Sequence, residues 1–352
     1  MRQPLILAID TSCDETAAAV TQGRKILSNV ISSQINIHKK YGGVVPFLAK
    51  RAHEAKIAFV IHESMTRSNL VSKQGSTLPD AVAVTIGPGL APALEVGINY
   101  AKKLAQDWHK PLIAVNHMEG HLLSSLVQPN THTPGVKEIS TPGVNFPALA
   151  LLVSGGHTEL ILAKKIGQYK ILGQTLDDAA GEALDKLAKM LKLGYPGGPI
   201  VEELAKKGNP EAIKLPVPMQ YSKDLNFSFS GLKTAALYQI KNVGTVLTKK
   251  YIENMCAAFQ QAIAISLCTK LKNAIKQYQP KAILLGGGVI SNLYIRRQIR
   301  AAAKPLPVLV PAYKKLFTDN AAMIGIAAYW HYLRQDFADP ETLDRQPNLR
   351  LC

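Results

Sequence analysis

Two histidines four residues apart give the sequence its sharpest chemical signal. In segment 117–121, His-Met-Glu-Gly-His, a helix would place both imidazoles on one face, where they could share a metal ion. Two unrelated histidines at the start of a helix are the alternative, and it stays open. Glu119 does not directly follow the first histidine, as it would in the zinc peptidase motif H-E-x-x-H. We therefore expect Glu119 to turn away from the shared face.

Asp319, in Phe-Thr-Asp-Asn at 317–320, is the candidate for a third metal ligand from a distant part of the chain. The same residue could instead cap the helix that follows. Two imidazole nitrogens and one carboxylate, with coordination positions left open, suit iron or zinc.

The segment 10–16, Asp-Thr-Ser-Cys-Asp-Glu-Thr, follows a short apolar run and carries three carboxylates and several hydroxyls. Such a turn could hold a phosphate through its backbone N–H groups and hydroxyls, and a divalent cation through its acids. A hairpin turn with local hydrogen bonds is an equally open interpretation.

Glycine-rich turns follow other apolar runs. Ser-Gly-Gly at 154–156 allows a ligand to approach the backbone closely, and Gly-Gly-Gly at 286–288 precedes Ser291 and Asn292. This last turn opens a basic helix that contains Arg296, Arg297 and Arg300. Glycine turns at helix starts favour anions and nucleotides. The sequence has no GxxxxGK[ST] motif, and no GxGxxG follows the first predicted strand, which argues against a P-loop and a dinucleotide fold.

An acidic segment, 177–186, opens another predicted helix. Its acids could simply compensate the helix dipole, or Asp185 could accept a hydrogen bond from a ligand in a cleft. The segment Tyr-Pro-Gly-Gly-Pro at 195–199 predicts a rigid turn near the end of that helix. The spacing in Phe-Ser-Phe-Ser-Gly at 227–231 assigns no chemistry.

Buried strands that alternate with helices must position these residues, and they predict an α/β protein. The expected strands are 5–9, 81–86, 112–115, 148–153 and 282–285. The expected helices are 49–66, 95–108, 184–191, 252–275 and 321–333. The strand and turn at Leu5 resemble those at Ala148, which suggests a coarse duplication.

Composition narrows the classes of protein. Over 352 residues, 47% are apolar and 41 Lys and Arg outnumber 25 Asp and Glu, for a net charge of +16. A folded enzyme this basic favours a polyanionic partner, nucleic acid first. No apolar run reaches the roughly 18 residues of a membrane span. The four cysteines form no CxxC pair, so we expect a reducing, cytoplasmic environment and no membrane.

Taken together, the motifs resemble one family over about residues 5–335. The matching segments are 10–16, Tyr-Gly-Gly-Val-Val-Pro at 41–46, Gly-Pro-Gly-Leu at 87–90, 117–121, Leu-Val-Ser-Gly-Gly-His-Thr at 152–158, Asp-Asp-Ala-Ala-Gly-Glu-Ala at 177–183, 195–199, Phe-Ser-Phe-Ser-Gly-Leu-Lys-Thr at 227–234 and Thr-Asp-Asn-Ala-Ala-Met-Ile at 318–324. In order and spacing they resemble the tRNA N6-adenosine threonylcarbamoyltransferase family of bacterial type, formerly called O-sialoglycoprotein endopeptidases. Asn116 departs from the family pattern, which often has a histidine there.

The resemblance implies the actin/Hsp70/sugar-kinase-like (ASKHA) fold, with two α/β lobes around a nucleotide cleft. We expect an N-terminal lobe at 1–127, on which the helix near 320–335 packs back. A linker or surface excursion at 128–147, a second lobe at 148–335 and a tail at 336–352 would follow.

The implied activity is transfer of a threonylcarbamoyl group from threonylcarbamoyl-adenylate to N6 of adenosine 37 in tRNAs that read codons beginning with A. The resemblance implies that one divalent metal, iron(II) before zinc, is held by His117, His121 and Asp319. It places Asp14 and Glu15 in a motif implicated in activity. The implied substrate contacts are Leu152, Val153, Ser154, Gly155, Gly156, Asp185, Gly198, Glu202 and Asn292.

The resemblance also implies partners besides tRNA: a shorter paralogue of the same fold and a small ATPase. Three alternatives stay open at this point. They are a metallopeptidase, as the family's former name holds, a sugar or acetate kinase that shares the fold, and a scaffold paralogue without a working site. The intact histidine pair and Asp319 argue against the scaffold.

Overall fold

The computed structural model describes residues 2–72, 75–128, 144–244 and 246–351. The chain forms two compact units, which are described separately. Unit 1 combines Met1–Val144 with Val310–Cys352, and unit 2 is Asn145–Leu309. Most of the predicted linker at 128–147 lies outside the described residues.

Unit 1 contains a five-stranded sheet in the order β3-β2-β1-β6-β7. Its strands are β1 (Leu5–Asp10), β2 (Glu15–Gln22), β3 (Lys25–Ser33), β6 (Ala81–Gly87) and β7 (Leu112–Asn116), and β4 (Val71–Ser72) pairs with β5 (Gly75–Ser76) as a separate hairpin. β1, β2 and β3 run antiparallel, whereas β1, β6 and β7 run parallel. The carboxyl ends of β1, β6 and β7 therefore share one edge.

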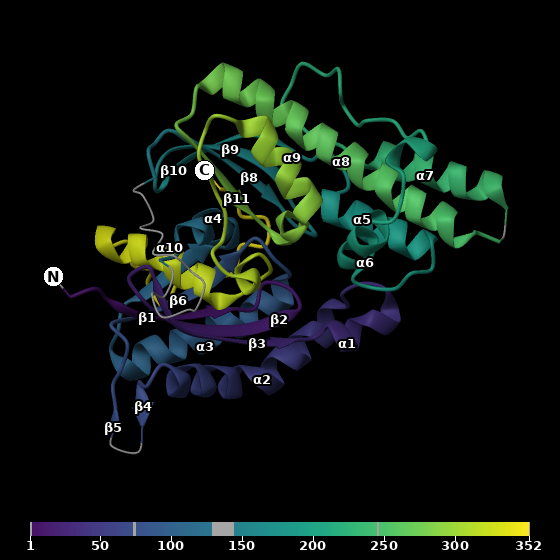
Figure 1. Ribbon diagram of the computed structural model, residues 1–352. Helices are drawn as coiled ribbons and strands as arrows, with labels where there is room; N and C mark the ends of the chain where they lie inside the picture. Colours follow the sequence, from purple (N-terminus) through teal and green to yellow (C-terminus); the bar gives the residue numbers. More distant parts are fainter. Residues whose placement is uncertain (1, 73–74, 129–143, 245, 352) are drawn as a thin grey trace. The chain divides into compact units, whose positions relative to one another are not determined.

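Helices cover both faces of this sheet. They are α1 (Ile35–His38), α2 (Pro46–Arg67), α3 (Ala91–Trp108), α4 (His117–Leu123) and α10 (Ala321–Arg334), with short 3-10 turns η1 (Lys39–Tyr41), η2 (Ser124–Leu126) and η5 (Lys314–Leu316). Figure 1 shows α2 and α3 on one face and α10 on the other. Successive side chains of a strand point to opposite faces of the sheet. Leu5, Leu7 and Ile9 of β1 therefore pack in the core with α2 and α3, and Ile6 and Ala8 point to the face that α10 covers.

Unit 2 repeats the sheet plan of unit 1. Its order is β10-β9-β8-β11-β12, with β8, β9 and β10 antiparallel and β8, β11 and β12 parallel. The strands are β8 (Ala148–Val153), β9 (Thr158–Lys165), β10 (Gln168–Gln174), β11 (Ala282–Gly286) and β12 (Val308–Leu309). β1 and β8 hold the same central place in their sheets, so the predicted duplication is confirmed.

The helices of unit 2 supply most of its remaining mass (Figure 1). They are α5 (Ala180–Met190), α6 (Gly197–Ala205), α7 (Ser230–Val243), α8 (Lys249–Tyr278) and α9 (Leu293–Ala303), with 3-10 turns η3 (Pro210–Ala212) and η4 (Gly288–Ser291). All five predicted strands and all five predicted helices are present, and the α/β class is confirmed.

The compact units divide the chain at 309, whereas the sequence placed the second lobe's end at 335. α10 returns to unit 1 as expected, since it packs against β1, β2 and α4. The predicted tail also belongs there: Ala338 N–H donates to Leu112 O at 2.8 Å, and Gln346 N–H donates to Ile86 O at 2.7 Å.

Candidate metal centre and ligand turns

The histidine pair sits at a sharp change from strand to helix. β7 ends at Asn116, whose side-chain oxygen accepts hydrogen bonds from Met118 N at 2.8 Å and Glu119 N at 3.4 Å. This N-cap starts α4 directly at His117. Asn116, which departs from the family pattern, therefore has a clear local role.

α4 presents His117 and His121 together, as the spacing predicts. Both side chains are buried, and their ring centroids lie 4.8 Å apart with perpendicular planes. A Cβ at Gly120 would come within 2.9 Å of Ile324 Cδ1, so the glycine lets α4 approach α10 without displacing that side chain. That approach brings the residue before α10's cap, Asp319, to the histidines.

Asp319 completes the cluster. Its Oδ1 lies 3.4 Å from His117 Nε2 and 3.1 Å from His121 Nε2, and the ligand atoms of all three residues fall within 4.8 Å of one another. Asn320, not Asp319, caps α10 by accepting from Met323 N at 3.1 Å. The capping interpretation of Asp319 is therefore wrong, and its carboxylate is available to a metal.

The electrostatics of the cluster favour a cation. Burial disfavours the imidazolium of His117, but Asp319 and Asp10 outweigh it and raise the pKa of His117 to about 10. Burial likewise opposes charge on Asp319, yet the two imidazoles hold the pKa of that carboxyl well below its usual range. His117 Nδ1 and His121 Nδ1 are buried, with no hydrogen-bond partner among the described residues. Two imidazoles and a half-exposed carboxylate fit a divalent metal with open positions.

The acidic motif lies beside this cluster. Asp10 ends β1, and Asp14 and Glu15 stand where β2 begins, so the hairpin interpretation of 10–16 describes the backbone. Burial, followed by the charges of Asp319 and Asp14, raises the pKa of Glu15 to about 10. The same turn thus carries the acids near the metal candidates, and the two interpretations of the motif are compatible.

In unit 2, the glycine turns gather at the carboxyl ends of two parallel strands. Leu152 pairs with Gly286, so the turns that follow β8 and β11 leave the sheet at the same edge. Gly287 has φ 91°, and a Cβ there would come within 2.4 Å of Val153 O. Gly181 N donates to Ser154 O at 3.2 Å, which places the start of α5 against the same turn.

Hydrogen bonds connect the other predicted ligand residues. Asp185 Oδ1 accepts a hydrogen bond from Gly197 N at 2.7 Å. Burial raises the pKa of Asp185, and this effect outweighs the backbone N–H groups of Gly197 and Gly198, which lower it. Glu202 Oε1 accepts from Leu293 N at 2.8 Å, which joins α6 to α9. Asn292 caps α9 and donates to Gln260 at 2.6 Å, which leaves one amide N–H for a ligand.

The structure thus brings the predicted residues together in two groups. His117, His121, Asp319, Asp14 and Glu15 gather in unit 1. The nine predicted substrate contacts belong to unit 2, where Leu152 and Val153 are buried strand residues and 154–156 form the turn. A Cβ at Gly155, Gly156 or Gly198 would meet no atom within 4 Å, so the backbone there is open to a ligand.

The comparison with known proteins assigns the family. A family model for tRNA N6-adenosine threonylcarbamoyltransferase matches residues 25–326 of this chain. The chain belongs to this family. A threonylcarbamoyltransferase of Moorella thermoacetica is 46% identical over 349 residues, covering 98% of this chain and 97% of that protein. One of Anaeromyxobacter dehalogenans (strain 2CP-C) is 47% identical over 350 residues, covering 98% and 99%.

Solved structures confirm the ASKHA-type fold of this threonylcarbamoyltransferase family member. HypF of T. kodakarensis has a TM-score of 0.62 and 13% identity, with 95% of this chain and 48% of that chain covered. Component A of the Acidaminococcus fermentans (R)-2-hydroxyglutaryl-CoA dehydratase has a TM-score of 0.52 and 13% identity, covering 94% and 99%. At this identity the likeness shows the fold alone.

Sequence reasoning included Asp10 among the acids of 10–16 but did not predict its contact with His117, and it did not predict the partner of Glu119. Asp10 lies next to His117, its Oδ2 3.5 Å from Nδ1, and the signal was a carboxylate at the end of a fully buried strand. Glu119 does turn away from the metal candidates, because it pairs with His331 Nε2 at 2.8 Å. The linear spacing gave no sign of His331, which comes from the far end of α10.

The segment 227–231, to which the sequence assigned no chemistry, leads into α7 and is held by hydrogen bonds. Asp177 accepts from the hydroxyls of Ser228 at 2.5 Å and Ser230 at 2.6 Å, and from Phe229 N at 2.8 Å. These bonds hold the start of α7 against the segment that joins β10 to α5. Asp178 pairs with Lys186 and Lys233, so the acids at 177 and 178 are structural.

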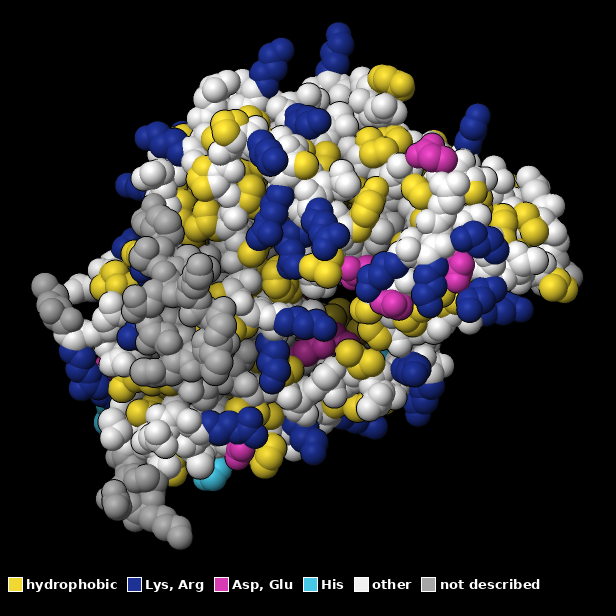
Figure 2. Space-filling view, in the orientation of Figure 1, with side chains coloured by type: hydrophobic (Ala, Val, Ile, Leu, Met, Phe, Trp, Pro, Cys, Tyr) yellow, Lys and Arg dark blue, Asp and Glu magenta, His cyan; other side chains and the backbone are white. Residues whose placement is uncertain are grey.

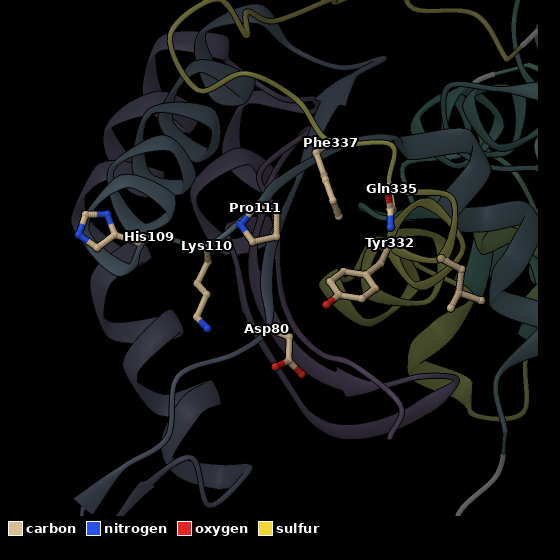
Figure 3. Close-up of a pocket in the computed structure, with 8 residues that line it drawn as sticks. Asp80, His109, Lys110, Pro111, Tyr332, Gln335 and Phe337 are labelled. Carbon is tan, nitrogen blue, oxygen red and sulfur yellow. The ribbon is translucent and has the colours of Figure 1, made fainter. Parts of the chain in front are cut away.

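A separate hollow of about 490 Å³ lies in unit 1, and Figure 3 shows the residues around it. Asp80, His109, Lys110, Pro111, Tyr332, Leu333, Gln335 and Phe337 line it. Asp80 precedes β6 and Pro111 precedes β7, so the hollow lies at the amino ends of these strands. The metal candidates follow the carboxyl ends, and the two sites are therefore distinct.

Among the described residues, no helix combines the length and apolarity that crossing a membrane requires.

Proposed function

We propose that this protein transfers the threonylcarbamoyl group of threonylcarbamoyl-adenylate to N6 of adenosine 37 in tRNAs that read codons beginning with A, with release of AMP. The observation that carries the proposal is the cluster of His117, His121 and Asp319, formed by motifs of this family. In the reaction, the bond from N6 to the carbamoyl carbon forms and the acyl–phosphate bond breaks. With tRNA as substrate, the cytoplasm is the proposed place of action.

Unit 2 is proposed to bind the adenylate. The open backbone at Gly155, Gly156 and Gly198 allows close approach of phosphate and ribose, and backbone N–H groups suit an anion. Asp185 and Glu202 are fixed by hydrogen bonds to neighbouring helices, so their free carboxylate oxygens are already oriented. Such preorganisation positions the ligand without further ordering of the chain.

Unit 1 is proposed to supply the chemistry. His117, His121 and Asp319 would hold iron(II) or, as second choice, zinc, and the bound ion would act as a Lewis acid toward the threonylcarbamoyl group. N6 of adenine is a poor nucleophile and loses a proton as it attacks. Asp14 lies beside the cluster and is the acid we propose to accept that proton. Glu15, whose pKa of about 10 keeps its carboxyl protonated near neutral pH, would donate a hydrogen bond instead.

The contacts of Glu119 argue against a peptidase. A zincin-like enzyme needs a carboxylate free to activate water at the metal, but Glu119 is buried and bound to His331. Kinases share the fold, yet the fold does not decide the reaction.

The decisive experiment supplies threonylcarbamoyl-adenylate and unmodified tRNA, together with the two proposed partners, a shorter paralogue of this fold and a small ATPase. We expect threonylcarbamoyladenosine in the nuclease-digested tRNA by mass spectrometry. A transcript with guanosine at position 37 and the His121→Ala variant should both give none. Casein cleavage that a chelator abolishes, with no modified nucleoside, would contradict the proposal.

A further inference from the structure

The positive charge of the chain is concentrated in unit 2. Residues 145–309 contain 22 Lys and Arg against 10 Asp and Glu, whereas the rest of the chain contains 19 against 15. Unit 2 therefore carries 12 of the 16 net positive charges. Since a single-sign field attracts a partner of opposite charge, unit 2 is the part of the chain to search for a polyanion surface.

Three arginines form one face of α9. Ile295 and Ile299 are buried under the helix, while Arg297 and Arg300 are exposed and Arg296 is half-buried. Burial, with the charges of Arg300 and Arg297, lowers the pKa of Arg296 despite the opposing charge of Glu202. Neither Arg297 nor Arg300 forms an ion pair with any described residue. Figure 2 shows Lys and Arg side chains over the part of the surface where α9 lies in Figure 1.

The same helix begins at the proposed adenylate site. Asn292 caps α9, and Glu202 binds its first N–H. At about 1.5 Å of rise per residue, Arg296 and Arg300 lie roughly 6 and 12 Å along the axis from that cap. An RNA backbone that delivers a base to the ligand turns would thus meet these arginines within about two and a quarter helical turns.

We propose that Arg296, Arg297 and Arg300, the arginine face of α9, bind the phosphate backbone of the RNA substrate beside the adenylate site. This inference rests on the proposed function, because RNA is the polyanion that the reaction requires. A guanidinium group can donate two parallel hydrogen bonds to one phosphate. Arg297 and Arg300 are exposed and form no ion pair with the described residues, so they need not break an existing contact to bind phosphate. Contacts of the arginine face with phosphates would position the RNA without distinguishing its base sequence.

The test compares two double variants of equal charge. Arg297→Gln with Arg300→Gln alters the arginine face and leaves its buried side intact. The control, Lys164→Gln with Lys165→Gln, removes two exposed charges from the end of β9. Because Ala163 pairs with Ala148, these lysines lie at the edge of the unit 2 sheet opposite the ligand turns.

Binding of unmodified tRNA is measured by fluorescence anisotropy without adenylate, from low to moderate salt. We expect the α9 variant to bind about tenfold or more weakly near 0.1 M salt, with a slope of log K against log salt reduced by about 1.4–1.8. The control variant should change the affinity for tRNA and the salt slope far less. The KM for threonylcarbamoyl-adenylate should stay the same in the α9 variant. If the double variant does not fold, the Arg300→Gln variant should show about half the change in slope.

Equal weakening by both variants, or wild-type binding by the α9 variant, would overturn the proposal. So would retention on anionic lipid vesicles that depends on the arginine face while tRNA binding does not. Because binding is measured without turnover, failure to form modified nucleoside in the activity assay would contradict the proposed function separately.

Discussion

His117 Nδ1 faces Asp10 Oδ2 at 3.5 Å, on the side of the ring away from the Nε2 that faces Asp319. Asp10 Oδ1 is held by Ser12 N–H at 3.2 Å, so the carboxylate is fixed from its other side. The contact is an ion pair and not a hydrogen bond, and the negative charge of Asp10 favours a proton on His117 Nδ1, the ring nitrogen that faces it. The arrangement leaves Nε2 of His117 as the lone-pair donor of the cluster.

We predict that Asp10→Asn weakens metal binding about 10- to 100-fold, because the amide keeps the size of the side chain but loses the charge behind His117. Titration of the protein with Zn²⁺ or Co²⁺ against a competing chelator measures this directly. Asp80→Asn is the matched control, since Asp80 is a carboxylate at the opposite end of the same strands, where it accepts from Leu5 N. Equal affinities for wild type and Asp10→Asn would show that Asp10 does not orient the ligand.

Asp10 also illustrates what the sequence could and could not predict. Buried runs and the i, i+4 spacing predicted five parallel strands, five helices (α2, α3, α5, α8 and α10) and the pairing of His117 with His121. The partner strands β2, β3, β9 and β10 were not expected. β2 is rich in Ala and Thr and β10 is an edge strand with Gln and Lys, so neither has the continuous Val, Ile and Leu of a buried strand.

Contacts between distant segments were out of reach for spacing alone. Asp319 joins the histidines through the packing of α4 against α10, where Gly120 faces Ile324, and no local sequence pattern expresses that contact. Resemblance to a family predicted the ligand set, whereas the contacts of Asp10 with His117, of His331 with Glu119 and of Asp177 with Ser228 come from the folded chain. The resemblance did place α10 on unit 1, but the contacts of the tail, Ala338 with Leu112 and Gln346 with Ile86, had no signal in the linear pattern.

We predict that a divalent metal stabilises the wild-type protein through this cluster. At a free metal concentration about 100 times its Kd, the free energy of unfolding should rise by about 2.7 kcal/mol, and a chelator should remove the gain. The His121→Ala variant should lose this metal-dependent rise in the free energy of unfolding. Thermal unfolding with and without metal measures the effect. His62→Ala, an exposed histidine on α2, is the control and should retain it.

The Glu119–His331–Asp336 chain predicts a pH-dependent stability. His331 Nε2 lies 2.8 Å from Glu119 and its Nδ1 lies 2.7 Å from Asp336. Burial opposes the imidazolium, but the two carboxylates outweigh it and raise the pKa of His331 above its ordinary value. A raised pKa in the folded state stabilises the protein fully below the unfolded pKa of about 6.5, and this contribution is lost as pH rises through the folded pKa.

His331→Gln should therefore lower the free energy of unfolding by about 1–2 kcal/mol near pH 6 and by less near pH 9. Urea unfolding of both proteins at each pH gives the difference, in which the titration of other groups cancels. Asp336 is exposed, so Asp336→Asn should cost less than His331→Gln. A difference between wild type and His331→Gln that grows with pH would contradict a charged His331.

Asp177 predicts the opposite dependence in unit 2. Burial raises its pKa, but the hydroxyls of Ser228 and Ser230 and two backbone N–H groups more than offset this and lower it. A depressed pKa stabilises the protein above the unfolded value of about 3.9 and ceases to do so as pH falls through the folded pKa. Asp177→Asn should cost about 0.5–1 kcal/mol near neutral pH, because an amide oxygen cannot accept all four bonds and water screens this exposed side chain. The cost should shrink in acid, as followed by urea unfolding with Asp107→Asn, at an exposed carboxylate on α3, as the control. A cost that is constant from neutral to acid pH would mean that the side chain acts by shape and not by charge.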